Sequence, residues 1–109
     1  MGIRAKIWLE KDGELVFSRG RGELLRMTRD MGSLYRAAKA LSMSYRAAWG
    51  KIRVTEKKLG WKLVKVEGPR RHFILTPAGE DLLNRYLELE QEAERVLLEL
   101  YHKRFPSGL

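Results

Sequence analysis

The sequence predicts an α+β fold that is mainly α, with the architecture of a winged helix–turn–helix. Three observations predict it: a turn signal between two alternating segments near the N-terminus, two closely spaced helical segments in the middle, and an alternating pair of segments directly after them. A chain of 109 residues has an ordinary size for one domain, so we expect residues 1–109 to form a single domain.

Residues 1–18 are expected to form a β-hairpin. The segments 3–9 and 14–18 alternate in part between apolar and polar residues. Asp12-Gly13 between them favours a hairpin because both residues tolerate a positive φ. The side chains expected to face inward are Ile3, Ile7, Leu9, Leu15 and Phe17.

Three helices are expected within residues 22–60. Apolar residues show helical spacing from residue 23 to residue 31, after a break at residues 20–22, and Gly32 is expected to end this first helix. Ser33 and Ser44 are N-cap candidates for the next two helices, and Gly60 ends the third. The helix–turn–helix then covers residues 33–59, and the residues expected to pack its helices together are Ala38, Met43, Ala48 and Ile52.

A wing and a long helix complete the predicted fold. Residues 61–75 are expected to form the wing, as two strands around a turn at residues 67–71. Thr76 as N-cap and Pro77 at the first helical position begin a C-terminal helix over residues 77–104. We interpret Trp49 as a packing residue between the third helix and the wing, with base stacking as the alternative.

Composition argues against several classes of protein. The chain has no cysteine, and its two histidines lie far apart in the sequence, which is unlike a metal cluster. Paired carboxylates, a Ser–His–Asp set and a phosphate-binding glycine loop are not evident, so we expect no enzyme activity and no cofactor. An apolar run of membrane-spanning length and a signal-peptide pattern are also missing, so we expect a cytoplasmic protein that makes no membrane contact.

The charge is unevenly distributed along the chain. The formal net charge is +8 from 22 basic and 14 acidic residues, and residues 1–76 hold 18 of the basic but only 7 of the acidic ones. Residues 77–109 hold 4 basic and 7 acidic residues. This distribution indicates that residues 1–76 bind a polyanion and that residues 77–109 contact a different partner. The alternative is that the net charge only aids solubility.

The second helix of the helix–turn–helix, over residues 44–59, is the candidate recognition helix. It carries residue types that contact phosphates and base edges when a helix lies in the major groove, and the wing turn is basic. A solvated helix face and a solvated turn are the alternatives, and Lys57 and Lys58 are expected to add only general positive field. The candidate DNA-binding residues are Ser44, Tyr45, Arg46, Gly50, Lys51 and Arg53 on the helix and Arg70, Arg71 and His72 on the wing.

The C-terminal helix is expected to mediate dimerisation. It carries two apolar rows, more than a small domain needs on one helix, and one row has the 4, 3, 4 spacing of a heptad seam. An ordinary core helix is the alternative. The candidate dimerisation residues are Leu82, Tyr86, Leu89, Ala93, Val96 and Leu100, and the row beside them consists of Leu83, Leu87, Leu97 and Tyr101.

The segments 32–41 (GSLYRAAKAL) and 43–49 (MSYRAAW), with residues 75–79 (LTPAG), resemble the DNA-binding domain of the molybdate-dependent regulators of the ModE family. The expected N-terminal hairpin and first helix are also similar to ModE-like domains. LysR-type regulators share parts of these motifs more distantly, and normally begin almost at the helix–turn–helix. The ModE resemblance implies a homodimeric regulator whose residues 44–53 enter the major groove and whose residues 67–72 form the wing. No molybdate-binding domain is evident in the sequence.

The function that we expect is sequence-specific binding of double-stranded DNA by a homodimeric transcription regulator. Its two recognition helices would enter successive major grooves about 34 Å apart on an inverted repeat. A winged-helix protein-interaction module and a non-specific architectural DNA-binding protein are the alternatives. A protein that binds single-stranded nucleic acid usually has several exposed aromatic residues on one face, on which bases stack, and only Tyr45 and Trp49 are candidates here.

Overall fold

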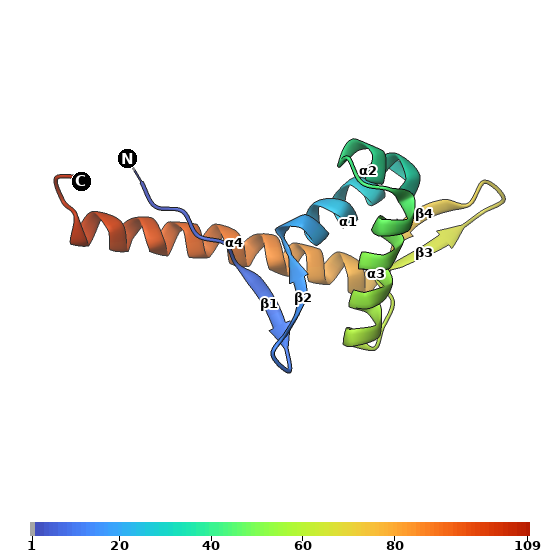
Figure 1. The fold of residues 1–109 in the computed structure, drawn as a ribbon, viewed down its shortest axis with the longest axis horizontal. Helices are drawn as coiled ribbons and strands as arrows, with labels where there is room; N and C mark the ends of the chain where they lie inside the picture. The colour runs from blue at the N-terminus through green and yellow to red at the C-terminus, as the bar shows by residue number, and fades with distance from the viewer. Residues whose placement is uncertain (1) are drawn as a thin grey trace.

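The computed structural model describes residues 2–109 and contains, within them, four helices and two small antiparallel sheets (Figure 1). Helices α2 and α3 form the helix–turn–helix, and the hairpin of β3 and β4 lies beside them as the wing. The predicted fold class, a mainly helical winged helix–turn–helix, is therefore confirmed. The elements in chain order are β1 Trp8–Lys11, β2 Glu14–Ser18, α1 Arg19–Met31, α2 Leu34–Ala40, α3 Tyr45–Leu59, β3 Val64–Glu67, β4 His72–Leu75 and α4 Pro77–Arg104.

The N-terminal hairpin turns at Asp12-Gly13, where both residues have a positive φ, 54° and 78°. Its register shifts by one residue, because Leu9 pairs with Phe17 whereas Glu10 pairs with Leu15. This bulge leaves Val16 unpaired in the ladder and allows both Val16 and Phe17 to be buried. The prediction that Ile3 and Leu15 face inward is wrong: Leu15 lies on the solvent side of the bulge, and Ile3 precedes the strand, which begins only at Trp8.

Helix α1 begins at Arg19, although the glycines at 20 and 22 predicted a break there. Packing overrides the poor helix propensity of glycine in this first turn. Gly22 is buried beside the Phe17 ring and Leu83 of α4, and the Arg19 guanidinium forms an ion pair with Glu90 of α4 at 3.0 Å. The start of α1 is therefore fixed by α4 and by the hairpin.

The helix–turn–helix is built as the small residues predict. Ala38 and Ala48 are fully buried where α2 and α3 meet, and Ile52 is buried one turn further along α3. The Ser33 and Ser44 hydroxyls accept hydrogen bonds from the backbone at the starts of α2 and α3, and Gly60 ends α3 in the left-handed conformation. Further core side chains from α1, α2, β4 and α4 surround these residues: Leu24, Leu25, Leu34, Ala37, Phe73, Leu75 and Leu83.

The wing is attached to the body by buried polar contacts. The Glu56 carboxylate of α3 accepts hydrogen bonds from the backbone N–H of Leu63 at 2.8 Å and of Val64 at 3.4 Å. The N–H of Phe73 on β4 donates to the carbonyl of Gly32, the residue that ends α1, at 3.1 Å. Strand β3 begins at Val64 because the preceding residues are held by these contacts and by the first turn of α4.

Helix α4 is the longest element, with 28 residues and a length of about 42 Å. It forms one side of the body with its first half and then projects beyond it (Figure 1). Within the described residues, the segment before β1 lies along this projecting half (Figure 1). The overall dimensions, 59 × 30 × 22 Å, reflect the projection.

Candidate nucleic-acid interface

One face of α3 carries a stripe of exposed residues opposite its buried residues. Ala48, Ile52 and Thr55 point into the core. At steps of four, three and four along the other side lie the exposed residues of what we term the outward stripe: Arg46, Gly50, Arg53 and Lys57. These steps place the four residues on one face of the helix, over about 16 Å of its length.

The other residues predicted on this helix lie beside the stripe. Ser44 is the N-cap, and its Oγ accepts the N–H of Ala47 at 3.0 Å. Tyr45 is exposed at the first helical position. Lys51 is exposed but turns toward α1, where it borders a narrow crevice with Arg21. Burial lowers the pKa of the Arg21 guanidinium, whose Nη1 is enclosed without a hydrogen-bond partner among residues 2–109.

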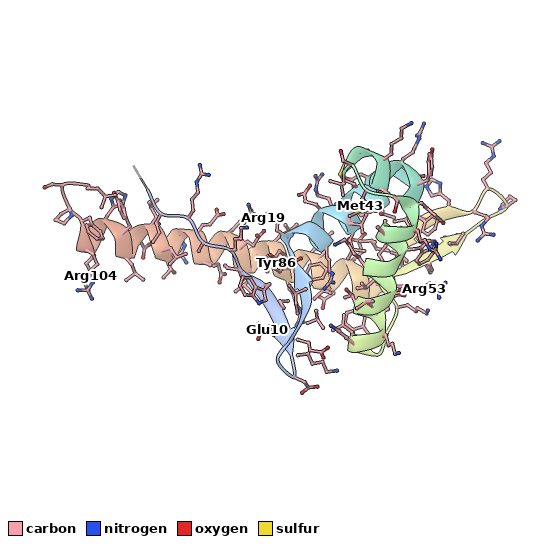
Figure 2. The ribbon with its side chains drawn as sticks, viewed as in Figure 1. Glu10, Arg19, Met43, Arg53, Tyr86 and Arg104 are labelled. Atoms are coloured by element: carbon pink, nitrogen blue, oxygen red, sulfur yellow. The ribbon has the colours of Figure 1, made fainter. Side chains whose placement is uncertain are left out.

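Trp49 links the recognition helix to the wing. Its ring meets Phe73 of β4 edge-on at 5.7 Å, and its Nε1 donates a hydrogen bond to the Tyr45 hydroxyl at 2.8 Å. The Arg53 guanidinium lies over the same ring at 4.9 Å, and Arg53 projects from α3 beside the wing (Figure 2). The packing interpretation of Trp49 is confirmed, and the cation–π contact orients Arg53 before any ligand arrives.

The wing tip is a tight basic turn. The N–H of Arg71 donates to the Gly68 carbonyl at 3.1 Å, and both residues have a positive φ, 53° for Arg71 and 75° for Gly68. Arg70 and Arg71 are exposed. His72, predicted as a DNA contact, lies with its ring against Gly32, so closely that any Cβ at that glycine would overlap it. This packing of His72 connects the wing to the turn between α1 and α2.

Most basic side chains of α2, α3 and the wing tip have no carboxylate partner among the described residues; on α3 the exception is Lys58, which pairs with Glu14 at 3.0 Å. On α1 and α4, arginines form ion pairs, as between Arg29 and Glu80 at 3.1 Å and between Arg85 and Asp81 at 3.1 Å. Within residues 2–109, ion pairs are absent from the following basic residues of α2, α3 and the wing tip: Arg36, Lys39, Arg46, Lys51, Arg53, Lys57, Arg70 and Arg71. Such a surface attracts a polyanion because no internal carboxylate neutralises it.

Sequence reasoning missed two residues of this surface. Lys57 was expected to contribute only general field, yet it continues the outward stripe; its spacing of four residues from Arg53 was the available signal. Tyr35 on α2 was not singled out, and 61% of its surface is exposed, next to Tyr45 at a ring distance of 6.5 Å. Nothing local in the sequence indicates that α2 brings Tyr35 beside the wing.

The acidic segment of α4 lies away from this surface. Glu90 and Glu94 both pair with Arg19, at 3.0 and 3.5 Å. Tyr86 lies close to Arg19 at the middle of α4 (Figure 2) and donates its hydroxyl to the Ile7 carbonyl at 2.7 Å. Burial, and then the nearby Glu90 carboxylate, raises the pKa of Tyr86.

The predicted dimerisation row is only partly accessible. Tyr86 is 1% exposed and packs edge-on against Phe17 at 5.1 Å, so it belongs to the protomer's own core and is removed from the candidate dimer surface. The reason is geometric: Tyr86 lies at the edge of the row, one turn from Leu83, which faces the core. Leu82 is half-buried against the core, Ala93 is half-buried, and the exposed members of the row are Leu89, Val96 and Leu100.

The fold and the basic surface define a winged helix–turn–helix domain of the kind found in DNA-binding regulators. Residues 17–80 match the family described as bacterial regulatory helix-turn-helix protein, lysR family. The match covers more than half of the chain, which therefore belongs to this family. Within residues 2–109, no helix is long and apolar enough to cross a membrane, and no group of three or more His, Asp or Glu side chains could hold a metal ion.

Solved structures of LysR-type domains are similar to this chain. The DNA-binding domain of CbnR in complex with DNA is 27% identical, with a TM-score of 0.54, over 68% of this chain and 86% of that one. Oxidised OxyR from Corynebacterium glutamicum is 27% identical, with a TM-score of 0.56, over 72% of this chain. The aligned region is 25% of the OxyR chain, so this chain spans only a fraction of that regulator.

A further structure, the BenM DNA-binding domain with benA site 1 DNA, is 21% identical with a TM-score of 0.60, over 83% of this chain and 97% of that one, and supports the fold alone. No curated protein is significantly similar to the chain. These similarities are to LysR-type proteins, the more distant of the two resemblances noted in the sequence.

Proposed function

We propose that this protein is a transcription regulator that binds double-stranded DNA with sequence preference, inserting α3 into the major groove. The observation that carries the proposal is the set of unpaired cations on α3 and on the wing tip, at one end of the molecule. The DNA complex of the 27% identical CbnR domain supports the same class of ligand.

Each part of this surface has a chemical role in the proposal. Arg46 and Arg53 present planar guanidinium groups that can donate two parallel hydrogen bonds to guanine O6 and N7. Ala47 and Val54, both exposed along one side of the outward stripe, offer apolar contact to thymine methyl groups. Lys57, Arg70 and Arg71 reach for phosphates, which position α3 without reading sequence.

The salt dependence and the variants of this surface test the proposal. If these three cations neutralise about three phosphates per protomer, the logarithm of the binding constant falls with the logarithm of salt concentration with a slope of about −2.7 per protomer. Arg71→Ala is expected to weaken binding to all duplexes alike and to reduce the slope by about 1, whereas Arg46→Ala relaxes the preference at particular base pairs.

Arg95→Ala is the matched control, since Arg95 lies on α4 and pairs with Glu99 at 3.5 Å. It removes the same charge from the chain at a distance from α3 and should leave affinity and preference unchanged. Fluorescence titration of labelled duplexes measures all three variants. Equal losses for Arg46→Ala and Arg95→Ala would mean that α3 is not the contacting element.

We also propose that the protein acts as a homodimer joined through α4. Leu89, near the middle of α4, and Val96 and Leu100 on its projecting half leave an apolar stripe exposed, and a second copy would cover it in an isologous contact. Analytical ultracentrifugation is expected to give twice the 12.7 kDa of one chain. Val96→Glu is expected to produce monomers, while Leu98→Glu, an equally exposed position on another side of α4, should not.

Within the LysR family, we propose that the chain is a ModE-like member. The support is the β1–β2 hairpin in front of α1, together with the segments 32–41, 43–49 and 75–79, on which the ModE resemblance rests. An operator determined by selection from random duplexes and found upstream of molybdate-related genes would support this placement. Operators unrelated to such genes would contradict it.

A further inference from the structure

A groove of about 480 Å³ opens between the wing tip and the helix–turn–helix. The wing contributes Arg70 and Arg71, α2 contributes Tyr35, and α3 contributes Tyr45, the first residue of the recognition helix. Phe73 lies at the base, where it packs against Trp49. This wing-tip groove therefore lies between the two elements that are proposed to contact DNA.

The lining of the wing-tip groove selects for an anion. It contains two guanidinium groups and two phenols but no carboxylate, and neither arginine has an ion-pair partner within the described chain. Two further grooves among residues 2–109 do contain carboxylates. One has Glu90 and Glu94 beside its basic residues, and the other has Glu56 beside Arg53, Lys57 and Lys62.

The Tyr45 hydroxyl is free to donate a hydrogen bond, and the exposed Tyr35 lies beside it. The Tyr45 hydroxyl accepts the indole N–H of Trp49 at 2.8 Å, which occupies an oxygen lone pair and leaves the hydroxyl hydrogen able to donate. Tyr35 is 61% exposed, and its ring lies 6.5 Å from that of Tyr45 at an angle of 48°. An exposed aromatic ring beside two arginines also offers an apolar surface on which a sugar can pack.

The backbone of the wing tip supports the same assignment. Arg71 adopts a positive φ of 53°, a conformation that costs free energy for a residue with a side chain. The turn that imposes this conformation is closed by the hydrogen bond from Arg71 N–H to Gly68 O at 3.1 Å. It holds two consecutive arginines at the rim of the groove.

We propose that the wing-tip groove clasps one DNA backbone phosphate with its deoxyribose, between the Tyr35 and Tyr45 hydroxyls and the Arg70 and Arg71 guanidinium groups. The inference rests on the proposed function and deepens it, because it makes Tyr35 of α2 a DNA contact. A volume of about 480 Å³ lies in the range of pockets that enclose ligands larger than a single ion. Since the clasp joins the wing to α2 and α3 on one strand, it sets the register in which the outward stripe meets the bases.

The test scans the phosphates of a selected duplex with single neutral methylphosphonate substitutions. Wild-type protein bound to the unmodified duplex is the reference, and its binding measures the proposed function separately. Tyr35→Phe keeps the ring and removes one hydrogen bond to a charged group, so a loss of about tenfold in affinity is expected. At one phosphate position the methylphosphonate should abolish this difference between variant and wild type, and Arg71→Ala should show its smallest effect at that same position.

Tyr101→Phe is the matched control, because Tyr101 lies near the far end of α4, and it should bind like wild type at every position. The proposal is overturned if Tyr35→Phe binds the unmodified duplex as tightly as wild type, or if its loss is the same at every modified phosphate while wild type binds normally. A free oxyanion is the other possible source of the phosphate chemistry. A saturable change of tryptophan fluorescence with inorganic phosphate, absent with sodium chloride of equal ionic strength and absent in Arg71→Ala, would likewise overturn the assignment to DNA.

Discussion

Replacement of Gly50 by alanine is expected to stabilise the fold and to weaken DNA binding at the same time. Gly50 lies inside α3 on the outward stripe, and a Cβ built there meets nothing within 4 Å. A glycine in a helix interior costs about 0.8–1.0 kcal/mol relative to alanine. Gly50→Ala should therefore raise the free energy of unfolding by about 0.8 kcal/mol, or roughly 3–6 °C in Tm for a domain of this size.

The expected loss in binding follows from the position of Gly50 between Arg46 and Arg53. With only hydrogen at this position, the backbone of α3 can approach the floor of the major groove more closely than a methyl group permits. A methyl group there displaces both arginines from the base edges, and a loss of about 1 kcal/mol, roughly fivefold in affinity, is expected.

Urea unfolding and DNA titration of the same preparations measure the two effects of Gly50→Ala. Gly79→Ala is the matched control for stability. A Cβ at Gly79 would overlap the backbone carbonyl of Leu63, which cannot move aside as a flexible side chain can. The free energy of unfolding of this variant should therefore fall by about 1–3 kcal/mol. A Gly50→Ala protein that is more stable and binds DNA as tightly as wild type would refute the close approach of α3. A destabilised Gly50→Ala would contradict the open space seen on this face.

Three further substitutions test other parts of the structure. Glu56→Ala leaves the buried N–H groups of Leu63 and Val64 without their acceptor. It is expected to lower the free energy of unfolding in urea by about 1–3 kcal/mol. A loss below 0.5 kcal/mol, about the effect of a surface substitution, would show that these hydrogen bonds are not needed. The pKa of Tyr86 is raised in the folded state, so its contribution to stability is fully present below the unfolded pKa of about 10 and is lost as pH rises through the folded pKa. Tyr86→Phe should therefore reduce the decline in Tm across this alkaline range. An unchanged decline would contradict the burial of the hydroxyl. Arg71→Gly relieves the backbone strain of the positive φ of 53°, so this variant should unfold at the same urea concentration as wild type or a higher one. It should bind DNA about tenfold more weakly, because a guanidinium contact is lost. Unchanged binding would show that the wing tip is not part of the interface.

The helix–turn–helix could be predicted well from local sequence because its signals act over a few residues. The serine caps at 33 and 44, the glycines that end α1 and α3, and the small residues at 38 and 48 each satisfy a requirement of the backbone or of a close helix crossing. The turn at Asp12-Gly13 belongs to the same class of signal.

The deviations arise where contacts distant in sequence decide the outcome. The bulge at Val16 is stabilised by Thr55 of α3, whose hydroxyl donates to the Val16 carbonyl at 3.1 Å, and no pattern within the hairpin shows this. Helix α1 extends to Arg19 because Glu90 of α4 pairs with it. Tyr86 fits a heptad seam by spacing, yet Phe17 and the Ile7 carbonyl draw it into the core.

The candidate interface shows the same division. The spacing of Arg46, Gly50 and Arg53 within one helix predicts that they share a face, and the structure agrees. The positions of His72 against Gly32 and of Tyr35 beside the wing depend on how the β3–β4 hairpin packs on α1 and α2. Sequence spacing within one element contains no information about that packing.

The most direct test of the central claim is the selection of bound sequences from a random duplex pool at two salt concentrations. We expect enrichment of an inverted repeat, with affinity that falls steeply as salt increases, since two copies of α3 would read equivalent half-sites. Salt-sensitive binding without an enriched sequence would contradict sequence-specific recognition and favour an architectural role. Absence of binding at the lower salt concentration would contradict DNA binding itself and leave a protein partner as the occupant of this surface.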